Sequence, residues 1–430
     1  MRKFSLLLLV AALILGFASM GHARAQTVEL RMIWYNDGNE GEVLRGLLDK
    51  FEADHSGIKV VIETVPFKDL PTVMQTQLES NNPPDMARLT DVPRYRGKYL
   101  DLRPLLKDAE LFESSFPAEV LATYRSGSED KGLYGYPTQF TVTGPLINAT
   151  LFAQAGVDIP TGDTTLAEWV ELAKQVKEAT GVPYAVAIDR SLHRITGPSL
   201  SLGGQWVDKE TGKITFDNPA TREFLDMLKS WHDEDITPKN IWIAENDKYA
   251  AGRDYFVNGE LVFYYSGSWQ VGGFANDIGD KFDWRAVPMP CGPGGCTGMP
   301  GGASVMAFGG TKHPEAVAMV MEYLSSEAVY GEFAAKTLFL PGHLGLIAKG
   351  VDYPTQKDNL NVFASSIPKL SEQGYLFQQS SLTGPMNEEL RIRIGQALVG
   401  EITMDEAVKA VQKVADDACA AEPAKCPPFN

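Results

Sequence analysis

The chain has 430 residues, of which 44% are hydrophobic, and its formal net charge is −16. This length is too great for a single hydrophobic core and predicts two domains. The excess of acidic residues disfavours nucleic-acid binding, because contact with a phosphate backbone depends on lysine and arginine displacing counterions. We therefore expect a globular protein with no nucleic-acid partner.

The first 25 residues have the pattern of a secretory signal peptide. Arg2 and Lys3 precede an apolar run over 6–17, and a small-residue site ends at Ala25, so cleavage is expected before Gln26. The apolar run is too short to span a membrane. No cysteine lies near the cleavage site. We therefore expect an exported, periplasmic protein without a lipid anchor.

The mature chain begins with alternating strands and helices. Strands are expected over 28–34, 58–65 and 84–89, with a helix ending near Asp54 and another that has Pro71 in its first turn. This alternation predicts an α/β fold with a mainly parallel sheet.

Ligands of such sheets bind beyond the carboxyl ends of the strands. The polar residues that follow the first and third strands are therefore candidate binding residues: Asn36, Asp37, Asn39, Glu40 and Asp91. The alternative for each is a helix cap or a solvated charge, and capping is the commoner role for Asn36 and Asp37.

The stretch 132–160 predicts a long strand with a turn on each side. Its mid-strand glycine, Gly144, is typical of a bend or a close backbone approach. We interpret the segment as a strand that leaves one domain and enters the other, and an ordinary core strand is the alternative.

A second α/β pattern follows. Thr165 and Glu168 form a capping box at the start of a helix, and a strand over 183–189 comes next. A glycine turn presents Trp206, a candidate binding residue, and Trp269 ends a hydrophobic strand within 256–269. For Trp269, exposure at the crevice is favoured over core burial because Gly272 and Gly273 follow it.

The last part of the chain predicts a second crossing over 283–290 and a strand over 301–308 that includes Gly302, a further candidate binding position. Helices are expected around 387–399 and 403–419. The predicted N-terminal lobe is 26–140 plus about 288–342, and the C-terminal lobe is about 145–285 plus 343–430. No flexible linker is present, so the crossings themselves would join the lobes.

Four cysteines form two local pairs, Cys291 with Cys296 and Cys419 with Cys426. Of the three possible connectivities, two local disulfides are favoured in a chain bound for an oxidising compartment. A zinc site is the alternative, but the CxxC spacing and the nearby histidine are missing. We expect neither a metal nor a cofactor.

Several motifs occur in an order that resembles the extracellular solute-binding proteins of ABC importers, in particular the sugar-binding group that includes the maltose- and trehalose-binding proteins. These motifs are the PPD at 83–85, GLYGYP at 132–137, LFAQAGVDIP at 151–160, the T-x-x-E-W helix start at 165–169, FVNGELVFYYSGSW at 256–269 and LPGH at 340–343. The similarity covers nearly the whole mature chain.

The resemblance implies a type II periplasmic-binding-protein fold, in which two lobes joined by hinge crossings close over a solute. It also implies that a permease reads the closed form and that the protein is a monomer. Trp269 matches a tryptophan that stacks on a sugar ring, and Asp91 matches an acid that binds hydroxyls. Gln139, Thr141 and His343 lie where the group places other ligand contacts, but with different residue types, so the resemblance does not name the sugar.

The residue chemistry supports a polyol independently. Sugar hydroxyls match Asp, Asn and Gln, and the C–H faces of a sugar match aromatic planes. One rival is a secreted glycoside hydrolase with Glu40 and Asp91 as its carboxylate pair. The other is a binding protein of the same fold for a polyol, a polyamine, a sugar phosphate or iron. No catalytic serine or HExxH motif is present, so we do not expect an enzyme.

Overall fold

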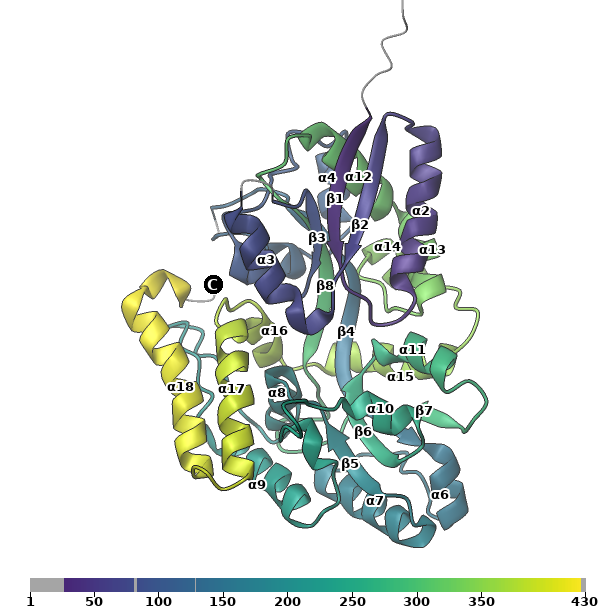
Figure 1. The fold of residues 1–430 in the computed structure, drawn as a ribbon, viewed down its shortest axis with the longest axis vertical. Coiled ribbons are helices and arrows are strands. Elements are labelled where there is room, and N and C mark those ends of the chain that lie inside the picture. The colour runs from purple at the N-terminus through teal and green to yellow at the C-terminus, as the bar shows by residue number, and fades with distance from the viewer. Residues whose placement is uncertain (1–26, 81–82, 128, 427–430) are drawn as a thin grey trace, which may run out of the picture.

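The computed structural model describes residues 27–80, 83–127 and 129–426. The signal peptide expected over 1–25 and its cleavage site lie outside these residues. Figure 1 shows two halves joined by a long strand that runs from one to the other. We call them the N-terminal half and the C-terminal half.

Eight strands are described. They are β1 (Val28–Trp34), β2 (Ile58–Thr64), β3 (Met86–Leu89), β4 (Gly135–Asn148), β5 (Tyr184–Ile188), β6 (Leu261–Gly267), β7 (Trp284–Ala286) and β8 (Pro300–Ala307). Their order is β2-β1-β3-β8-β4-β6-β5, with β7 also paired to β4. The first part of β4 pairs with β8 and its last part pairs with β6 and β7, so β4 is the predicted crossing strand.

The sheet is mixed, whereas the sequence pattern predicted mainly parallel sheets. β1 pairs in parallel with β2 and β3, and β5 with β6. β8 runs antiparallel to both β3 and β4, and β4 runs antiparallel to β6 and β7. The antiparallel pairs arise because β4 and β8 are crossings that run in opposite directions, not βαβ units.

The helices lie on both faces of the sheet in each half (Figure 1). In the N-terminal half they are α2 (Glu40–Asp54), α3 (Leu70–Glu79), α4 (Ala109–Ser114), α5 (Ala118–Ala122), α12 (Pro314–Ser325), α13 (Glu327–Thr337) and α14 (Leu344–Lys349). In the C-terminal half they are α6 (Ala149–Ala155), α7 (Leu166–Thr180), α8 (Leu192–Ser201), α9 (Pro219–Asp233), α10 (Gly252–Val257), α11 (Gln270–Asp277), α15 (Lys357–Ser366), α16 (Glu372–Gln378), α17 (Thr383–Leu398) and α18 (Met404–Ala421). The short 3-10 helices are η1 (Phe67–Asp69), η2 (Val92–Tyr95), η3 (Lys239–Ile241), η4 (Ile367–Lys369) and η5 (Pro423–Lys425). Within the described chain, no helix is both long enough and apolar enough to cross a membrane.

Each half has its own hydrophobic core. Val287 and Met289 belong to the core of the C-terminal half, so the chain enters the N-terminal half through β8, later in the sequence than the predicted crossing over 283–290. Leu346 of α14 belongs to the core of the N-terminal half. The chain therefore returns to the C-terminal half after α14, whereas the sequence prediction placed this return at 343.

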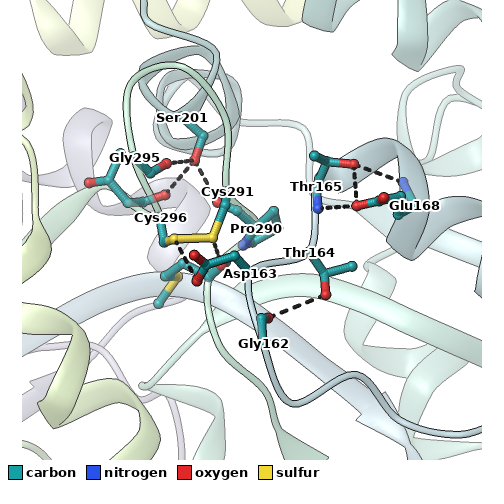
Figure 2. Close-up of a disulfide and its surroundings, with 12 residues drawn as sticks. Gly162, Asp163, Thr164, Thr165, Glu168, Ser201, Pro290, Cys291, Gly295 and Cys296 are labelled. Carbon is teal, nitrogen blue, oxygen red and sulfur yellow. Dashed lines mark hydrogen bonds between the residues drawn. A yellow bond between two sulfur atoms is a disulfide. The ribbon is translucent and has the colours of Figure 1, made fainter.

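Both predicted disulfides are confirmed: Cys291 is bonded to Cys296, and Cys419 to Cys426. Figure 2 shows the first bond beside the Ser201 hydroxyl, which lies 2.7 Å from the carbonyl oxygen of Pro290. The amide of Cys291 donates to the carbonyl of Thr164 at 2.9 Å. The disulfide loop is therefore fastened to the start of α7 and the end of α8, just before the chain enters β8.

Replacing Cys291 and Cys296 together by serine should lower the free energy of unfolding. A loop this short contributes roughly 2 kcal/mol by the chain-entropy relation. Urea unfolding followed by circular dichroism would measure the loss. The Cys419→Ser/Cys426→Ser variant is the matched control. Its loop lies in a different part of the chain but is of similar length, so the chain-entropy relation predicts an equal loss for both variants. An unchanged midpoint in both variants would contradict the entropic account.

Candidate binding site between the two halves

A fully buried arginine organises the edge of the N-terminal half that faces the C-terminal half. Arg88 is 0% exposed, and every residue of its strand, β3, is buried. Its Nη1 atom donates to the carbonyl of Tyr35 at 2.7 Å and to Glu40 at 2.6 Å. Its Nη2 atom donates to Asp37 at 2.9 Å and to Gln139 at 3.1 Å. A buried charge requires such partners, so Arg88 holds the loop after β1 against β4.

The polar residues of that loop mostly serve its own structure. Glu40, 1% exposed, accepts from the amides of Asp37 and Gly38 in addition to Arg88. Asn36 accepts from the Trp34 indole at 3.1 Å and from the Gly41 amide at 3.0 Å. The Asn39 amide group donates to the carbonyl of Lys336 at 3.1 Å. These contacts fit the capping alternative for Asn36. The side chains of Asn39 and Glu40 likewise stabilise the connection between β1 and α2.

Asp37 is the partly exposed carboxylate of the loop. Burial raises its pKa, while the guanidinium of Arg88 opposes the shift. The charge of Arg194, which belongs to α8 in the C-terminal half, also acts on Asp37. Asp37 and Arg194 are therefore near enough for their charges to interact across the boundary between the halves. Near them, a Cβ built on Gly38 would lie 3.5 Å from the backbone nitrogen of Gly273, so the two halves approach closely here.

Trp269 supplies an aromatic plane from the C-terminal half. It follows β6 and is partly exposed. Its ring lies back over Gly267, where a Cβ would be 1.9 Å from the nearest ring atom. The Arg194 guanidinium lies 4.2 Å from the ring centroid, over one face. A glycine is therefore required beside the ring, and Arg194 and Trp269 form one unit.

The strands that join the halves carry the remaining candidates. Gln139 is buried and bound to Arg88, and Thr141, further along β4, is partly exposed. Gly302 of β8 is paired with Phe140, and a Cβ there would lie 2.5 Å from the carbonyl oxygen of Gln139. The structure thus brings Gln139, Thr141 and Gly302 together on adjacent strands.

Asp91 lies where η2 meets α17 of the other half. Its Oδ1 atom accepts from the hydroxyl of Thr383 at 3.3 Å. Burial raises the pKa of Asp91 to about 6, and the charge of Arg94 and the Thr383 hydrogen bond oppose this shift. The Arg94–Glu388 ion pair joins the halves beside it. Asp91 is therefore an acid at the contact between the halves.

The elevated pKa of Asp91 predicts a pH dependence of stability. Because the folded state holds this proton more tightly than the unfolded chain, the contribution of Asp91 favours folding below about pH 4 and is lost as the pH rises through about 6. Asp91→Asn should remove this loss, so the variant gains stability relative to wild type above pH 6. Urea unfolding at a series of pH values would measure the difference.

Asp130→Asn is the matched control for this experiment. Burial acts on Asp130 too, but hydrogen bonds from the amides of Ser126 and Gly132 outweigh it and lower the pKa. Its contribution therefore has the opposite sign: it is present above about pH 4 and is lost as the pH falls. If Asp91→Asn and wild type show the same pH profile, Asp91 does not titrate at the contact.

Two predicted binding residues are buried and packed against aromatic rings. Trp206 is 0% exposed, its indole donates to Ser199 at 2.9 Å, and its ring packs against Phe216 and Phe377. His343 is 5% exposed and packs against aromatic rings of the N-terminal half, where it caps α14. The glycine turn before Trp206 turns the indole into the core, so both residues serve packing.

Arg88 and Arg194 are the residues that the sequence interpretation missed. For Arg88 a signal was available, since a charge inside an otherwise apolar strand needs partners, and Asp37 and Glu40 were already candidates. For Arg194 the helix itself was missed, because Pro198 lies inside α8. Proline inside a helix normally argues against one.

One group of potential metal ligands is close together in the described residues. It consists of Asp163, Cys291 and Cys296. Both sulfur atoms are bonded to each other and are not thiolates, so this group does not have the chemistry of a metal site.

Comparison with known proteins identifies the family of this chain. Residues 35–330, more than half of the chain, match the bacterial extracellular solute-binding protein family. The arabinooligosaccharide-binding protein of Halalkalibacterium halodurans is 28% identical over 271 residues, and the match spans 60% of this chain but only 58% of that relative.

Two solved structures share the fold. The maltose-bound MalE3 of T. maritima has a TM-score of 0.73 at 20% identity and covers 91% of this chain and 100% of its own. The GacH receptor of Streptomyces glaucescens, solved unliganded and with acarbose, has a TM-score of 0.75 at 20% identity and covers 91% and 99%. The fold is therefore that of the type II periplasmic binding proteins, and the chain belongs to the bacterial extracellular solute-binding protein family.

Proposed function

We propose that this protein is the periplasmic substrate-binding component of an ABC importer and that it captures a carbohydrate between its two halves. The observation that carries the proposal is that both halves supply suitable groups where they meet: Trp269 with Arg194 in the C-terminal half, and Asp37 and Asp91 in the N-terminal half. An aromatic plane matches the C–H face of a sugar, and carboxylates accept hydrogen bonds from its hydroxyls. Gln139 and Thr141 add polar groups on β4, the strand that joins the halves. The named ligands of the relatives, arabinooligosaccharide, maltose and acarbose, agree with this class.

In this proposal the halves close over the sugar by a hinge motion along β4 and β8, and the permease of the importer binds the closed monomer. Closure follows from differential contacts, since a ligand that touches both halves stabilises the arrangement in which both contacts are made. Small-angle scattering with and without ligand tests the motion. An unchanged radius of gyration at saturating ligand would contradict the proposed closure.

The rival hydrolase assignment has weak support. Its carboxylate pair would be Glu40 and Asp91, but Glu40 is buried and accepts hydrogen bonds from Arg88 and from two backbone amides. A carboxylate committed in this way is not free to act as an acid or a nucleophile on a glycosidic bond. Incubation with a panel of glycosides separates the two functions, since a binding protein returns its ligand unchanged.

Thermal-shift screening against a panel of sugars tests the carbohydrate proposal directly. A ligand at a hundred times its dissociation constant adds about 2.7 kcal/mol of stability. We expect at least one mono- or oligosaccharide to raise the melting temperature by several degrees. A flat response across sugars, accompanied by stabilisation with polyamines, would replace the carbohydrate assignment with a different solute.

A further inference from the structure

Three arginines of the C-terminal half lie together where that half faces the N-terminal half. Arg190 lies between β5 and α8, Arg194 lies in α8, and Arg391 comes from α17. We call this group the arginine cluster. The Nε atom of Arg391 donates to the carbonyl of Arg190 at 3.0 Å, which fixes the two chain segments together.

The cluster lies beside the candidate site. Arg194 covers one face of Trp269, and its charge acts on Asp37 of the N-terminal half. On α17, Glu388 is one helical turn before Arg391 and forms the ion pair with Arg94 that joins the halves. The cluster is therefore continuous with the residues proposed to bind the sugar.

The guanidinium groups of the cluster have few partners. In the described part of the chain, Arg190 has neither a hydrogen-bond acceptor nor a carboxylate within ion-pair distance, and the terminal nitrogens of Arg391 have none either. The Nε atom of Arg194 is buried without a hydrogen-bond partner and lies 3.8 Å from Asp189, too far for a hydrogen bond. Outside the cluster, the described arginines donate to a carboxylate or a carbonyl oxygen, as Arg94 does to Glu388 and Arg96 to Thr123.

The nearby acids are committed elsewhere. Asp189 accepts from the Tyr264 hydroxyl at 2.7 Å and from the Gly252 amide at 3.2 Å. Glu388 is engaged with Arg94. Burial, followed by the charges of Arg190 and Arg194, lowers the pKa of Arg391, and the opposing effects of Glu388 and Asp189 are smaller. In a chain with a net charge of −16, such a local excess of positive charge is unusual.

Two guanidiniums of the cluster lie over aromatic rings. Arg190 lies 3.3 Å from the ring centroid of Tyr249, and Arg194 lies 4.2 Å from that of Trp269. When the face of a guanidinium packs on an aromatic ring, its N–H donors lie in the plane of the guanidinium and point outward from the edge of that group. In-plane pairs of donors are the arrangement that binds a carboxylate or a phosphate in a bidentate manner.

We infer that the solute is a sugar that carries an anionic group, a carboxylate or a phosphate, and that the arginine cluster binds this group. The inference rests on the proposed carbohydrate function. It narrows the expected ligands to uronates, sugar phosphates and oligosaccharides that end in one of these. The sugar ring then lies toward Trp269, with the anion at Arg190, Arg194 and Arg391.

Calorimetric titration with matched ligands tests this inference. Each neutral sugar that is tried, such as glucose or a neutral disaccharide, is paired with its uronate and with its phosphate ester, and inorganic phosphate is titrated alone. We expect the anionic member of at least one pair to bind at least tenfold more tightly than the neutral member, and this preference should weaken as salt is raised. The uronate and phosphate arms show which anion the cluster takes.

Two variants on the same helix make the test specific. Arg391→Gln should weaken binding of the anionic member far more than binding of the neutral one, so that the preference for the anion is lost. Arg393→Gln is the matched control, because this arginine is 38% exposed and already donates to Glu389 and Gln396. It should leave both affinities unchanged. Circular dichroism confirms that both variants are folded.

The outcomes separate the inference from the function on which it rests. If neutral sugars bind as tightly as their anionic partners, or if Arg391→Gln weakens both equally, the inference is overturned and the carbohydrate function stands. If inorganic phosphate binds but no sugar of the panel does, or if neither phosphate nor any sugar binds, both the carbohydrate function and the inference are overturned.

Discussion

Replacing Arg88 with alanine is expected to destabilise the protein more than any other single change considered. The substitution leaves Glu40, which is 1% exposed, as a buried carboxylate that has lost its charged partner. Breaking a buried ion pair in this way typically costs about 3–5 kcal/mol. Arg88 also ties Asp37 and Gln139 to one another, so the loop after β1 should lose its fixed position. Urea unfolding monitored by circular dichroism would measure the loss.

Two further variants identify its cause. Arg94→Ala removes an ion pair whose acid, Glu388, is largely exposed, so the cost should be no more than about 1 kcal/mol. Arg88→Met combined with Glu40→Gln removes the arginine and the most buried of its acidic partners, and it should recover part of the loss seen in Arg88→Met alone. A small cost for Arg88→Ala, similar to that of Arg94→Ala, would contradict the organising role of Arg88.

Trp269→Ala should weaken ligand binding by roughly thirtyfold, because a well-packed aromatic anchor commonly contributes about 2 kcal/mol or more. The ring is partly exposed at the boundary between the halves and is positioned by Gly267 and Arg194. Calorimetric titration with the sugar identified by screening would measure the change. The fold should persist, since Trp269 lies at the end of β6 and outside both hydrophobic cores.

Trp269→Phe is the control for this change. It keeps an aromatic plane of smaller area, so affinity should fall between that of wild type and Trp269→Ala. If Trp269→Ala folds normally and binds as well as wild type, the ring supports Arg194 and does not contact the sugar, and the proposed position of the ligand must change.

Much of the fold could be predicted because local signals and long-range pairing agree. The capping box predicted at Thr165 is formed, and the helix expected over 403–419 is present and begins with a capping box of its own at Thr403. The crossing strand β4 was recognised from its β-branched residues between two turns. Strand direction could not be read in the same way, because the antiparallel pairing of β8 depends on where the chain re-enters the N-terminal half.

The candidate site was harder to predict than the fold. The carboxyl ends of the strands predicted Asp37 and Asp91 as candidates, but the roles of individual side chains depend on their partners. Glu40 has the same chemistry as Asp37 and lies only three residues away, yet it is buried beneath Arg88. Trp206 and Trp269 both follow glycine-containing turns, and only packing decides which one is exposed.

The position of β8 in the sheet has a consequence for the order in which the molecule assembles. β8 lies between β3 and β4, yet in the sequence it comes after every strand of the C-terminal half. During synthesis the sheet of the N-terminal half therefore has a gap until residue 307 has emerged, by which time β5, β6 and β7 are already available. Such pairing between distant segments slows folding. The sheet of the N-terminal half begins first in the chain, yet it receives its last strand only after every strand of the C-terminal half. Its open edges at β3 and β4 therefore remain unpaired in the growing polypeptide until β8 has emerged.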